Sequence, residues 1–294
     1  MYIKKSINAL CKIPYFMKRT RQPHLIMTLL VKNEEDMIAR NLEFHKKMGV
    51  DQFIVTDNNS SDNTLSILNT YKEKGWILDI IEETSTGYQQ KKWVDRMICL
   101  AKNKYKADWV INADADEFWY ARSGSLKTEL ATTRANVLRC PWQNMFPEEG
   151  KPYWEWSQYV RPVQDFSLYD LSPYAIYSKQ NKKVAHRTAG YLQISMGNHK
   201  VAMFPRLVEW SQDIVIYHFT IRGRQQFIDK MIQGGKELEQ NPKKHVGTHW
   251  RYFYELYQQN RLSEEYDRVV GLNAYERLKA DGYIRKCVPI GQLM

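Results

Sequence analysis

Three acidic side chains stand close together near the middle of the chain, directly after an apolar run. Asp114, Asp116 and Glu117 follow residues 108–113, which read Asp-Trp-Val-Ile-Asn-Ala. Carboxylates one residue apart at the end of a strand can converge on one divalent cation, and such a cation can bind a diphosphate. The alternative is a simple turn, because Asp is also a common turn residue. The elements around this acidic motif decide between the two interpretations.

The residues before the acidic motif alternate between strand and helix patterns. Short apolar runs predict strands at residues 24–31, 52–56, 76–81 and 108–113. Apolar stripes at helical spacing predict helices over residues 35–48, between Ser61 and Gly75, and over residues 89–105. Strands joined by such crossovers are parallel and are covered by helices on both faces. The sequence therefore predicts an α/β, Rossmann-like fold with a mostly parallel central sheet.

Polar clusters follow three of these predicted strands. Lys32, Asn33 and Glu34 come after the first strand, residues 57–59 after the second, and the acidic motif after the fourth. Ligands of such sheets bind beyond the carboxyl ends of the strands, so these clusters predict a site for a nucleotide and its metal. No glycine-rich phosphate-binding motif is present, which leaves a metal on carboxylates to neutralise a diphosphate.

The same motifs resemble a known family. Residues 29–35, 57–64, 114–118 and 217–230 are similar to family 2-like glycosyltransferases with the GT-A fold, in the bacterial branch that shares features with the family 92 type. Phe219 and Gly223 depart from that branch, which has Tyr and Ser there. The resemblance implies metal-dependent transfer of a sugar from a nucleotide diphosphate, a UDP-sugar, to a hydroxyl of a glycan or glycolipid. It also implies Mn²⁺ or Mg²⁺ as cofactor, an inverting reaction, and a role in bacterial surface polysaccharide or lipopolysaccharide synthesis.

The resemblance also assigns roles to individual residues. Asp114 and Asp116 would bind the metal, completed by His199 or, as the alternative, by His218. Asp57 would contact the base or ribose of the donor, and Glu34 would lie beside the base. The other predicted donor-binding residues are Lys32, Asn33, Asn59, Asp114, Lys183 and Arg187.

Two of these assignments have open alternatives. The basic run of residues 182–187 either faces the diphosphate or forms a solvated loop. The catalytic base stays unidentified, with Asp165 and Glu117 as candidates. The Trp- and Tyr-rich residues 142–177 are either a platform for a sugar or part of the core.

The sequence divides into three predicted regions. Residues 1–22 form a basic leader, residues 23–225 a catalytic domain with halves at 23–120 and 121–225, and residues 226–294 a helical C-terminal extension. The leader has apolar residues at helical spacing between lysines, which suits peripheral association with an anionic membrane surface. A partly disordered leader is the alternative.

Composition restricts the partners and the compartment. Lys and Arg number 43 against 33 Asp and Glu, a formal charge of +10, which favours anionic partners. The alternatives are an enzyme that makes nucleotide sugars and a basic nucleic-acid-binding module, although no nucleic-acid reader motif is present. The four cysteines lack metal or disulfide spacing, which favours a reducing compartment, and we expect a cytoplasmic protein. The basic leader would place it at the inner face of the cytoplasmic membrane.

Overall fold

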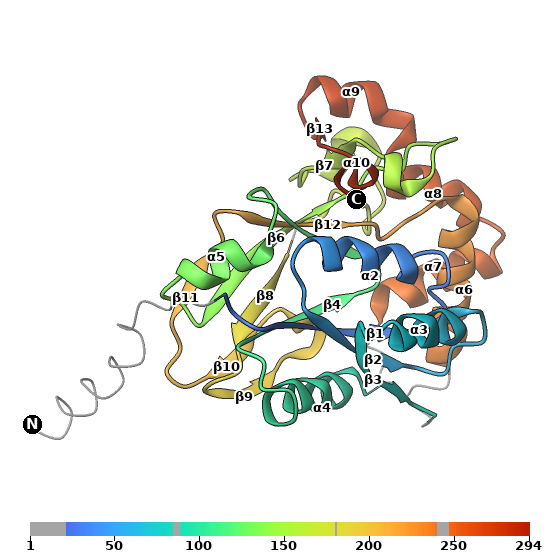
Figure 1. Cartoon of the computed structure of the whole chain (residues 1–294). Helices are drawn as coiled ribbons and strands as arrows, with labels where there is room; N and C mark the ends of the chain where they lie inside the picture. Colours follow the sequence, from blue (N-terminus) through green and yellow to red (C-terminus); the bar gives the residue numbers. More distant parts are fainter. Residues whose placement is uncertain (1–21, 85–88, 180, 240–246) are drawn as a thin grey trace, which may run out of the picture. The chain divides into compact units, whose positions relative to one another are not determined.

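The computed structural model describes residues 22–84, 89–179, 181–239 and 247–294 (Figure 1). The chain divides into two compact units. The first, here called the sheet unit, comprises Met1–Trp142 and Asn181–Tyr217; the second, the helical unit, comprises Gln143–Gln180 and His218–Met294. Each unit has an apolar core of its own. The predicted leader lies almost entirely outside the described residues, and its membrane role stays a prediction.

The sheet unit contains most strands of the central sheet. Its strands are β1 (Leu25–Val31), β2 (Gln52–Asp57), β3 (Ile77–Glu82), β4 (Trp109–Asp114), β5 (Glu117–Ala121), β6 (Val137–Asn144), β8 (Lys182–Arg187), β9 (Tyr191–Ile194), β10 (Val201–Met203), β11 (Val208–Trp210) and β12 (Ile214–His218). Its helices are α2 (Ile38–Lys47), α3 (Thr64–Glu73), α4 (Gln90–Asn103), α5 (Leu126–Thr132) and the short 3-10 helix η3 (Met196–Asn198). The order across the sheet is β3-β2-β1-β4-β8-β6-β12-β5, with β11 paired to β6.

The first four strands of the chain form the parallel part of the sheet. β1 pairs in parallel with β2 on one side and with β4 on the other, and β2 pairs in parallel with β3. The apolar side chains of β1, β2 and β4 are buried, as expected for strands that are covered on both faces. The predicted α/β fold with a mostly parallel sheet is confirmed.

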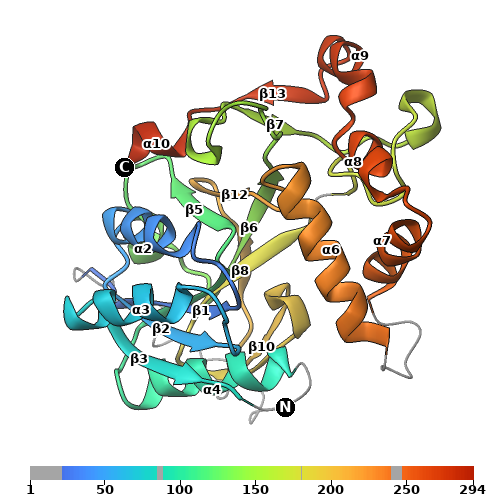
Figure 2. The same cartoon turned by 90° about the vertical axis from the view of Figure 1, so that its right-hand side faces the viewer.

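Helices cover the two faces of this parallel part. α2 and α3 lie on one face and α4 on the other, as the two perpendicular views agree (Figure 1, Figure 2). On α4, Val94, Met97 and Ile98 are fully or almost fully buried and belong to the core cluster that includes Ile26 of β1. Burial of this apolar stripe, and not helix propensity alone, stabilises α4.

The basic run of residues 182–187 is not a solvated loop. It forms β8, which pairs antiparallel with β4 and with β6 and is buried over four consecutive residues. The loop interpretation was wrong, because charged residues at both ends of the run resemble a surface loop although the run is a central strand of the sheet. The structure also adds β5, which only two residues separate from β4.

The helical unit contains the C-terminal helices. Its elements are β7 (Gln158–Val160), α6 (Arg224–Glu239), α7 (Thr248–Gln258), α8 (Leu262–Val270), α9 (Tyr275–Ala280), β13 (Ile284–Lys286), α10 (Ile290–Leu293) and 3-10 helices η1 (Tyr153–Glu155), η2 (Phe166–Tyr169) and η4 (Leu272–Ala274). α8 ends where Gly271 adopts a φ of 77°, a left-handed conformation that favours glycine. The predicted helical C-terminal extension is confirmed. No helix in the described ranges is both long enough and apolar enough to cross a bilayer.

Half of the aromatic residues between 142 and 177 are buried. Tyr153, Trp156, Tyr169 and Tyr177 are buried, and Tyr153 and Trp156 pack against Phe219. Their faces are covered by protein and do not form an open platform. The core interpretation is confirmed for these four residues.

Candidate functional site

The loops after β1, β2 and β4 share one edge of the sheet. In the strand register, Val31 lies beside Asp57, and Leu30 lies beside Asp114. The carboxyl ends of the three parallel strands therefore meet. Lys32, which follows Val31, belongs to the same edge, and the predicted convergence of the polar clusters is confirmed.

Reciprocal hydrogen bonds join the loops after β1 and β2. The Ser61 amide donates to Asn33 Oδ1 at 2.8 Å, and the Asn33 amide donates to Ser60 Oγ at 3.0 Å. Asn33 has a φ of 53°, which Asn tolerates better than most residues. The two loops therefore form one surface, which carries Glu34 and the exposed side chain of Asn59.

Asp57 lies beneath this surface. It is only 3% exposed, and its carboxylate accepts hydrogen bonds from the amide of Ser60 at 3.1 Å and from Ser60 Oγ at 2.5 Å. Asp57 thus shapes the loop that also carries Asn59. The structure places Lys32, Asn33, Glu34, Asp57 and Asn59 together at this edge.

A buried lysine lies within the acidic motif. Lys183 of β8 is 1% exposed, and its Nζ lies 2.8 Å from Asp114 Oδ2 and 2.9 Å from Glu117 Oε1. Glu117 Oε2 also accepts a hydrogen bond from the Asp114 amide at 3.3 Å, which closes the turn after β4. Lys183 and Glu117 therefore support Asp114 from inside the protein.

The electrostatics of this cluster leave an excess of negative charge. Burial lowers the pKa of Lys183, but attraction to Asp114 and Glu117 outweighs burial and raises it, so Lys183 stays charged. Burial and repulsion from Asp114 and Asp116 raise the pKa of Glu117, whereas attraction to Lys183 opposes this rise and favours the carboxylate. Lys183 pairs with two of the three carboxyl groups, those of Asp114 and Glu117. The motif therefore favours a further cation on its solvent side, where the side chain of Asp114 is 37% exposed.

His199 lies near this cluster with a defined tautomer. Its Nδ1 lies 2.8 Å from the Lys182 carbonyl oxygen, which only accepts, so Nδ1 carries the proton and Nε2 presents a lone pair. Burial lowers the pKa of His199, and Lys183 and Asp114 act on it with opposite signs. Gly197 has a φ of 71°, and a Cβ there would lie 2.7 Å from His199 Nε2, so glycine leaves room for the ring.

These residues fit a divalent cation whose coordination a bound diphosphate would complete. Carboxylate oxygens and a neutral imidazole are ligands that Mn²⁺ and Mg²⁺ accept. Within the described ranges, no three His, Cys, Asp or Glu side chains are arranged to hold an ion by themselves. Magnesium-type sites commonly use one or two carboxylates together with substrate phosphates and water. Asp114 and Asp116 would hold such an ion, with His199 as the nearby nitrogen ligand.

Within the sheet unit, one predicted donor-binding residue, Arg187, lies away from the acidic motif. Arg187 pairs with Trp109 at the start of β4, about 16 Å along the strand from Asp114, and its guanidinium lies over the Trp109 ring. Asp165 is exposed in the helical unit, where its carboxylate accepts from Ser167 and begins η2. These hydrogen bonds lower the pKa of Asp165.

His218 also belongs to the helical unit. Its Nδ1 lies 2.8 Å from Asn144 Oδ1. The sheet unit by itself unites His199, and not His218, with Asp114.

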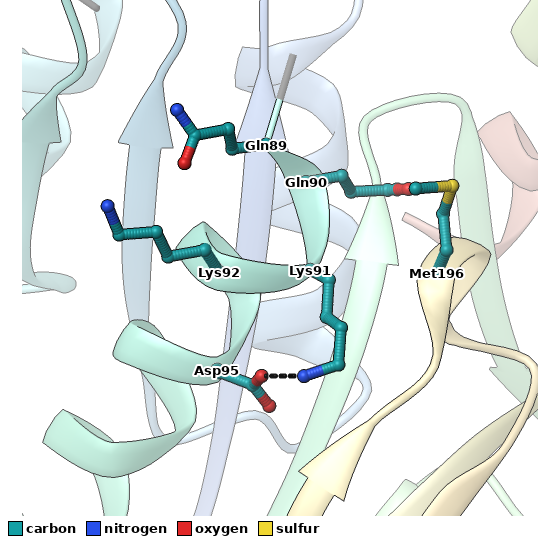
Figure 3. A pocket seen from close by; sticks show the side chains of 6 residues that line it. All are labelled: Gln89, Gln90, Lys91, Lys92, Asp95 and Met196. Atoms are coloured by element: carbon teal, nitrogen blue, oxygen red, sulfur yellow. Dashed lines mark hydrogen bonds and ion pairs between the residues drawn. The ribbon is translucent and has the colours of Figure 1, made fainter. Parts of the chain in front are cut away.

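A cavity of about 380 Å³ borders the segment that carries His199 (Figure 3). Its lining residues are Gln89, Gln90, Lys91, Lys92, Asp95 and Met196. The Gly197 amide donates to Gln90 Oε1 at 3.1 Å, which joins η3 to the beginning of α4. The cavity therefore lies on the α4 side of the sheet, beside the His199 segment.

Two buried residues of α2 contact the acidic motif and were not predicted as site residues. Asn41 and His45 have no solvent exposure; Asn41 donates to the Ala115 carbonyl oxygen between β4 and β5, and His45 accepts from the Trp119 amide of β5. The sequence contains one signal for them, because His45 stands on the apolar stripe of the predicted helix. A polar side chain in that position needs a buried partner.

A second buried histidine gives a testable pH dependence. Burial lowers the pKa of His186 to about 4. The unfolded chain binds a proton at this residue as pH falls below about 6.5, whereas the folded chain does not until about pH 4. Stability present above pH 6.5 is therefore lost toward pH 4, by about 1.4 kcal/mol per pH unit from this residue. His186→Gln should flatten the dependence of urea-unfolding free energies between pH 7 and pH 5; an unchanged slope contradicts this account.

A mostly parallel sheet brings carboxylates, a buried lysine and an imidazole together at its carboxyl edge, which is where ligands of such sheets bind. Comparison with known families specifies the class. The sequence profile of glycosyltransferase family 92 matches residues 27–251, and the chain belongs to this family.

Individual relatives are more distant. An uncharacterized glycosyltransferase of Rickettsia typhi is 36% identical over 89 residues, which are 30% of this chain and 26% of that protein. The chain thus matches about a quarter of the length of that relative. Among solved structures, Staphylococcus aureus TarS in complex with UDP is 14% identical, with a TM-score of 0.43 over 83% of this chain and 71% of that chain. The mannosyltransferase PcManGT of Pyrobaculum calidifontis, in complex with GDP-Man and Mn²⁺, is 15% identical, with a TM-score of 0.43 over 99% of this chain and 88% of that chain.

Proposed function

We propose that the protein transfers a sugar from a nucleotide diphosphate, a UDP-sugar, to a hydroxyl group of a glycan or glycolipid, with Mn²⁺ or Mg²⁺. The observation that carries this proposal is the acidic motif, which shares the carboxyl edge of the sheet with the loops after β1 and β2. A cation that binds an anionic ligand would compensate the carboxylates that exceed the single buried lysine. Family membership supplies the reaction class.

Residues of the sheet unit have separate roles in this proposal. The base and ribose of the donor face Lys32, Asn33 and Glu34 on the loop after β1. They also face Asn59 on the loop after β2, which Asp57 shapes. Asp114 and Asp116, with His199, hold the cation, which stabilises the charge of the departing diphosphate. We assign Glu117 and Lys183 to the support of Asp114, because both side chains are buried. We further propose an inverting reaction in bacterial surface polysaccharide or lipopolysaccharide synthesis.

Donor binding gives a direct test of this function. A UDP-sugar together with Mn²⁺ should raise the melting temperature by about 5 °C at about 100 times its Kd, because a ligand that binds only the folded state stabilises it. The same sugar nucleotides in EDTA should leave the melting temperature unchanged. A panel of UDP-, GDP- and TDP-sugars then identifies the base and the sugar. Stabilisation that is equal with and without the metal contradicts the metal dependence.

Two further assays separate the two alternatives. An enzyme that makes nucleotide sugars would release pyrophosphate from a nucleoside triphosphate and a sugar 1-phosphate. A nucleic-acid-binding module would retain oligonucleotides with an affinity that falls steeply as salt rises. Either result without donor-dependent stabilisation overturns the proposed function.

A further inference from the structure

Helix α2 reaches the backbone of the acidic motif through a fully buried asparagine. Asn41 Nδ2 donates to the Ala115 carbonyl oxygen at 2.8 Å and to the Glu117 carbonyl oxygen at 3.0 Å. These two carbonyl groups belong to the residues on either side of Asp116. One amide group therefore fixes the 115–116 and 117–118 peptide planes, which lie on either side of the peptide that joins Asp116 to Glu117.

A histidine one turn further along α2 extends this contact. His45 Nε2 accepts a hydrogen bond from the Trp119 amide at 2.9 Å, so the ring proton must lie on Nδ1. Nδ1 lies 2.9 Å from the carbonyl oxygen of Asn41 and 3.0 Å from its Oδ1, to which it donates. Burial lowers the pKa of His45 to about 3, so the ring stays neutral. The histidine thus orients the asparagine and binds the start of β5 with the same ring.

These contacts satisfy backbone groups that water does not reach. Ala115 is 2% exposed and Glu117 is fully buried. A buried carbonyl or amide group without a partner is costly, so the turn keeps this conformation only where α2 supplies the partners. The ring of Phe118, stacked on His45 at 5.9 Å and edge-on to Phe44 at 5.3 Å, packs the same turn against α2.

We propose that Asn41 and His45 are positioning residues, which hold Asp114 and Asp116 in the geometry that binds the cation and the donor diphosphate. This inference rests on the proposed function for its effect on binding. Its structural part, the attachment of residues 115–119 to α2, does not depend on that function. Residues that orient metal ligands through hydrogen bonds typically change metal affinity by about 10–100-fold when they are replaced.

The test uses one replacement, one conservative rescue and one matched control. His45→Leu removes the acceptor of the Trp119 amide, whereas His45→Gln keeps an acceptor and a donor in the side chain. His186→Leu is the control, because His186 is equally buried and also contacts an asparagine, Asn112, but not the turn. Three quantities are measured on the full chain: Mn²⁺ affinity with UDP present by electron paramagnetic resonance, exchange of the Trp119 amide, and the free energy of unfolding.

The proposal predicts that His45→Leu weakens Mn²⁺ binding about 10–100-fold and accelerates exchange of the Trp119 amide. His45→Gln should recover most of both losses. His186→Leu should lower the free energy of unfolding and leave Mn²⁺ affinity unchanged. A folded His45→Leu protein with unchanged Mn²⁺ affinity and unchanged Trp119 exchange overturns the proposal, as does an equal loss of Mn²⁺ affinity in the control.

A second variant keeps the test decisive if His45→Leu does not fold. Asn41→Ser leaves room for a water molecule between α2 and the two carbonyl groups, and it should weaken Mn²⁺ binding in the same direction. Unchanged affinity in folded Asn41→Ser overturns the proposal. If the unsubstituted protein binds no Mn²⁺ with UDP, the proposed function fails, while Trp119 exchange in the variants still decides whether α2 holds the turn.

Discussion

Replacing Asp116 by Asn is expected to abolish sugar transfer, with a loss in kcat/KM of about 10²–10³-fold or more, while the fold stays intact. The substitution keeps the volume of the side chain and removes a negative ligand from the cation that stabilises the leaving diphosphate. Asp114 is a less suitable target, because it pairs with the buried Lys183 and its replacement would disturb that ion pair as well. The measurement is initial-rate kinetics with the best UDP-sugar and Mn²⁺, together with circular dichroism of the folded protein.

Asp79→Asn is the matched control for this substitution. Asp79 lies on β3 of the same unit, and its carboxylate pairs with the half-exposed Lys104, a contact of little energetic value. Its replacement should leave kcat/KM unchanged. Full metal-dependent turnover by a folded Asp116→Asn protein would contradict the role of Asp116 as a ligand of the catalytic cation.

Lys183→Met is expected to lower the free energy of unfolding by about 3–5 kcal/mol. The substitution keeps the apolar stem of the side chain but leaves the fully buried Glu117, and one oxygen of Asp114, without the cation that compensates them. Removing one partner of a buried ion pair is costly because the other charge stays buried. The measurement is equilibrium unfolding in urea at pH 7.

The double variant and a surface control make the second prediction specific. Lys183→Met combined with Glu117→Gln should recover much of the lost stability, because the buried charge is then removed together with its partner. Lys91→Met, which breaks an exposed ion pair with Asp95, should change stability by less than about 1 kcal/mol. A Lys183→Met protein as stable as the Lys91→Met protein would contradict the assigned role of the buried lysine.

The parallel part of the fold could be predicted because its determinants are local. Buried strands of four to seven apolar residues, apolar helix stripes and glycines after the helices all lie within short windows of sequence. The shared edge of the polar clusters then followed from the geometry of parallel strands. For this reason Asp57 and Asp114 could be placed together although 57 positions of sequence separate them.

The support of the acidic motif could not be predicted, because it depends on partners that are distant in sequence. Lys183 meets Asp114 across 69 residues, on a strand whose charged ends resemble a surface loop. His45 meets the Trp119 amide across 74 residues. The sequence pattern placed His45 on a buried helix face but contained no information about which buried group it would contact.

The measurement that tests the central claim most directly is Mn²⁺ binding by electron paramagnetic resonance, titrated with and without UDP, for the unsubstituted protein, Asp116→Asn and Asp79→Asn. We expect UDP to tighten Mn²⁺ binding strongly in the unsubstituted protein and in Asp79→Asn, because the diphosphate completes the coordination that Asp114 and Asp116 begin. Asp116→Asn should lose this effect. Mn²⁺ binding that does not respond to UDP, or that survives unchanged in Asp116→Asn, would contradict a nucleotide diphosphate site at the carboxyl end of β4.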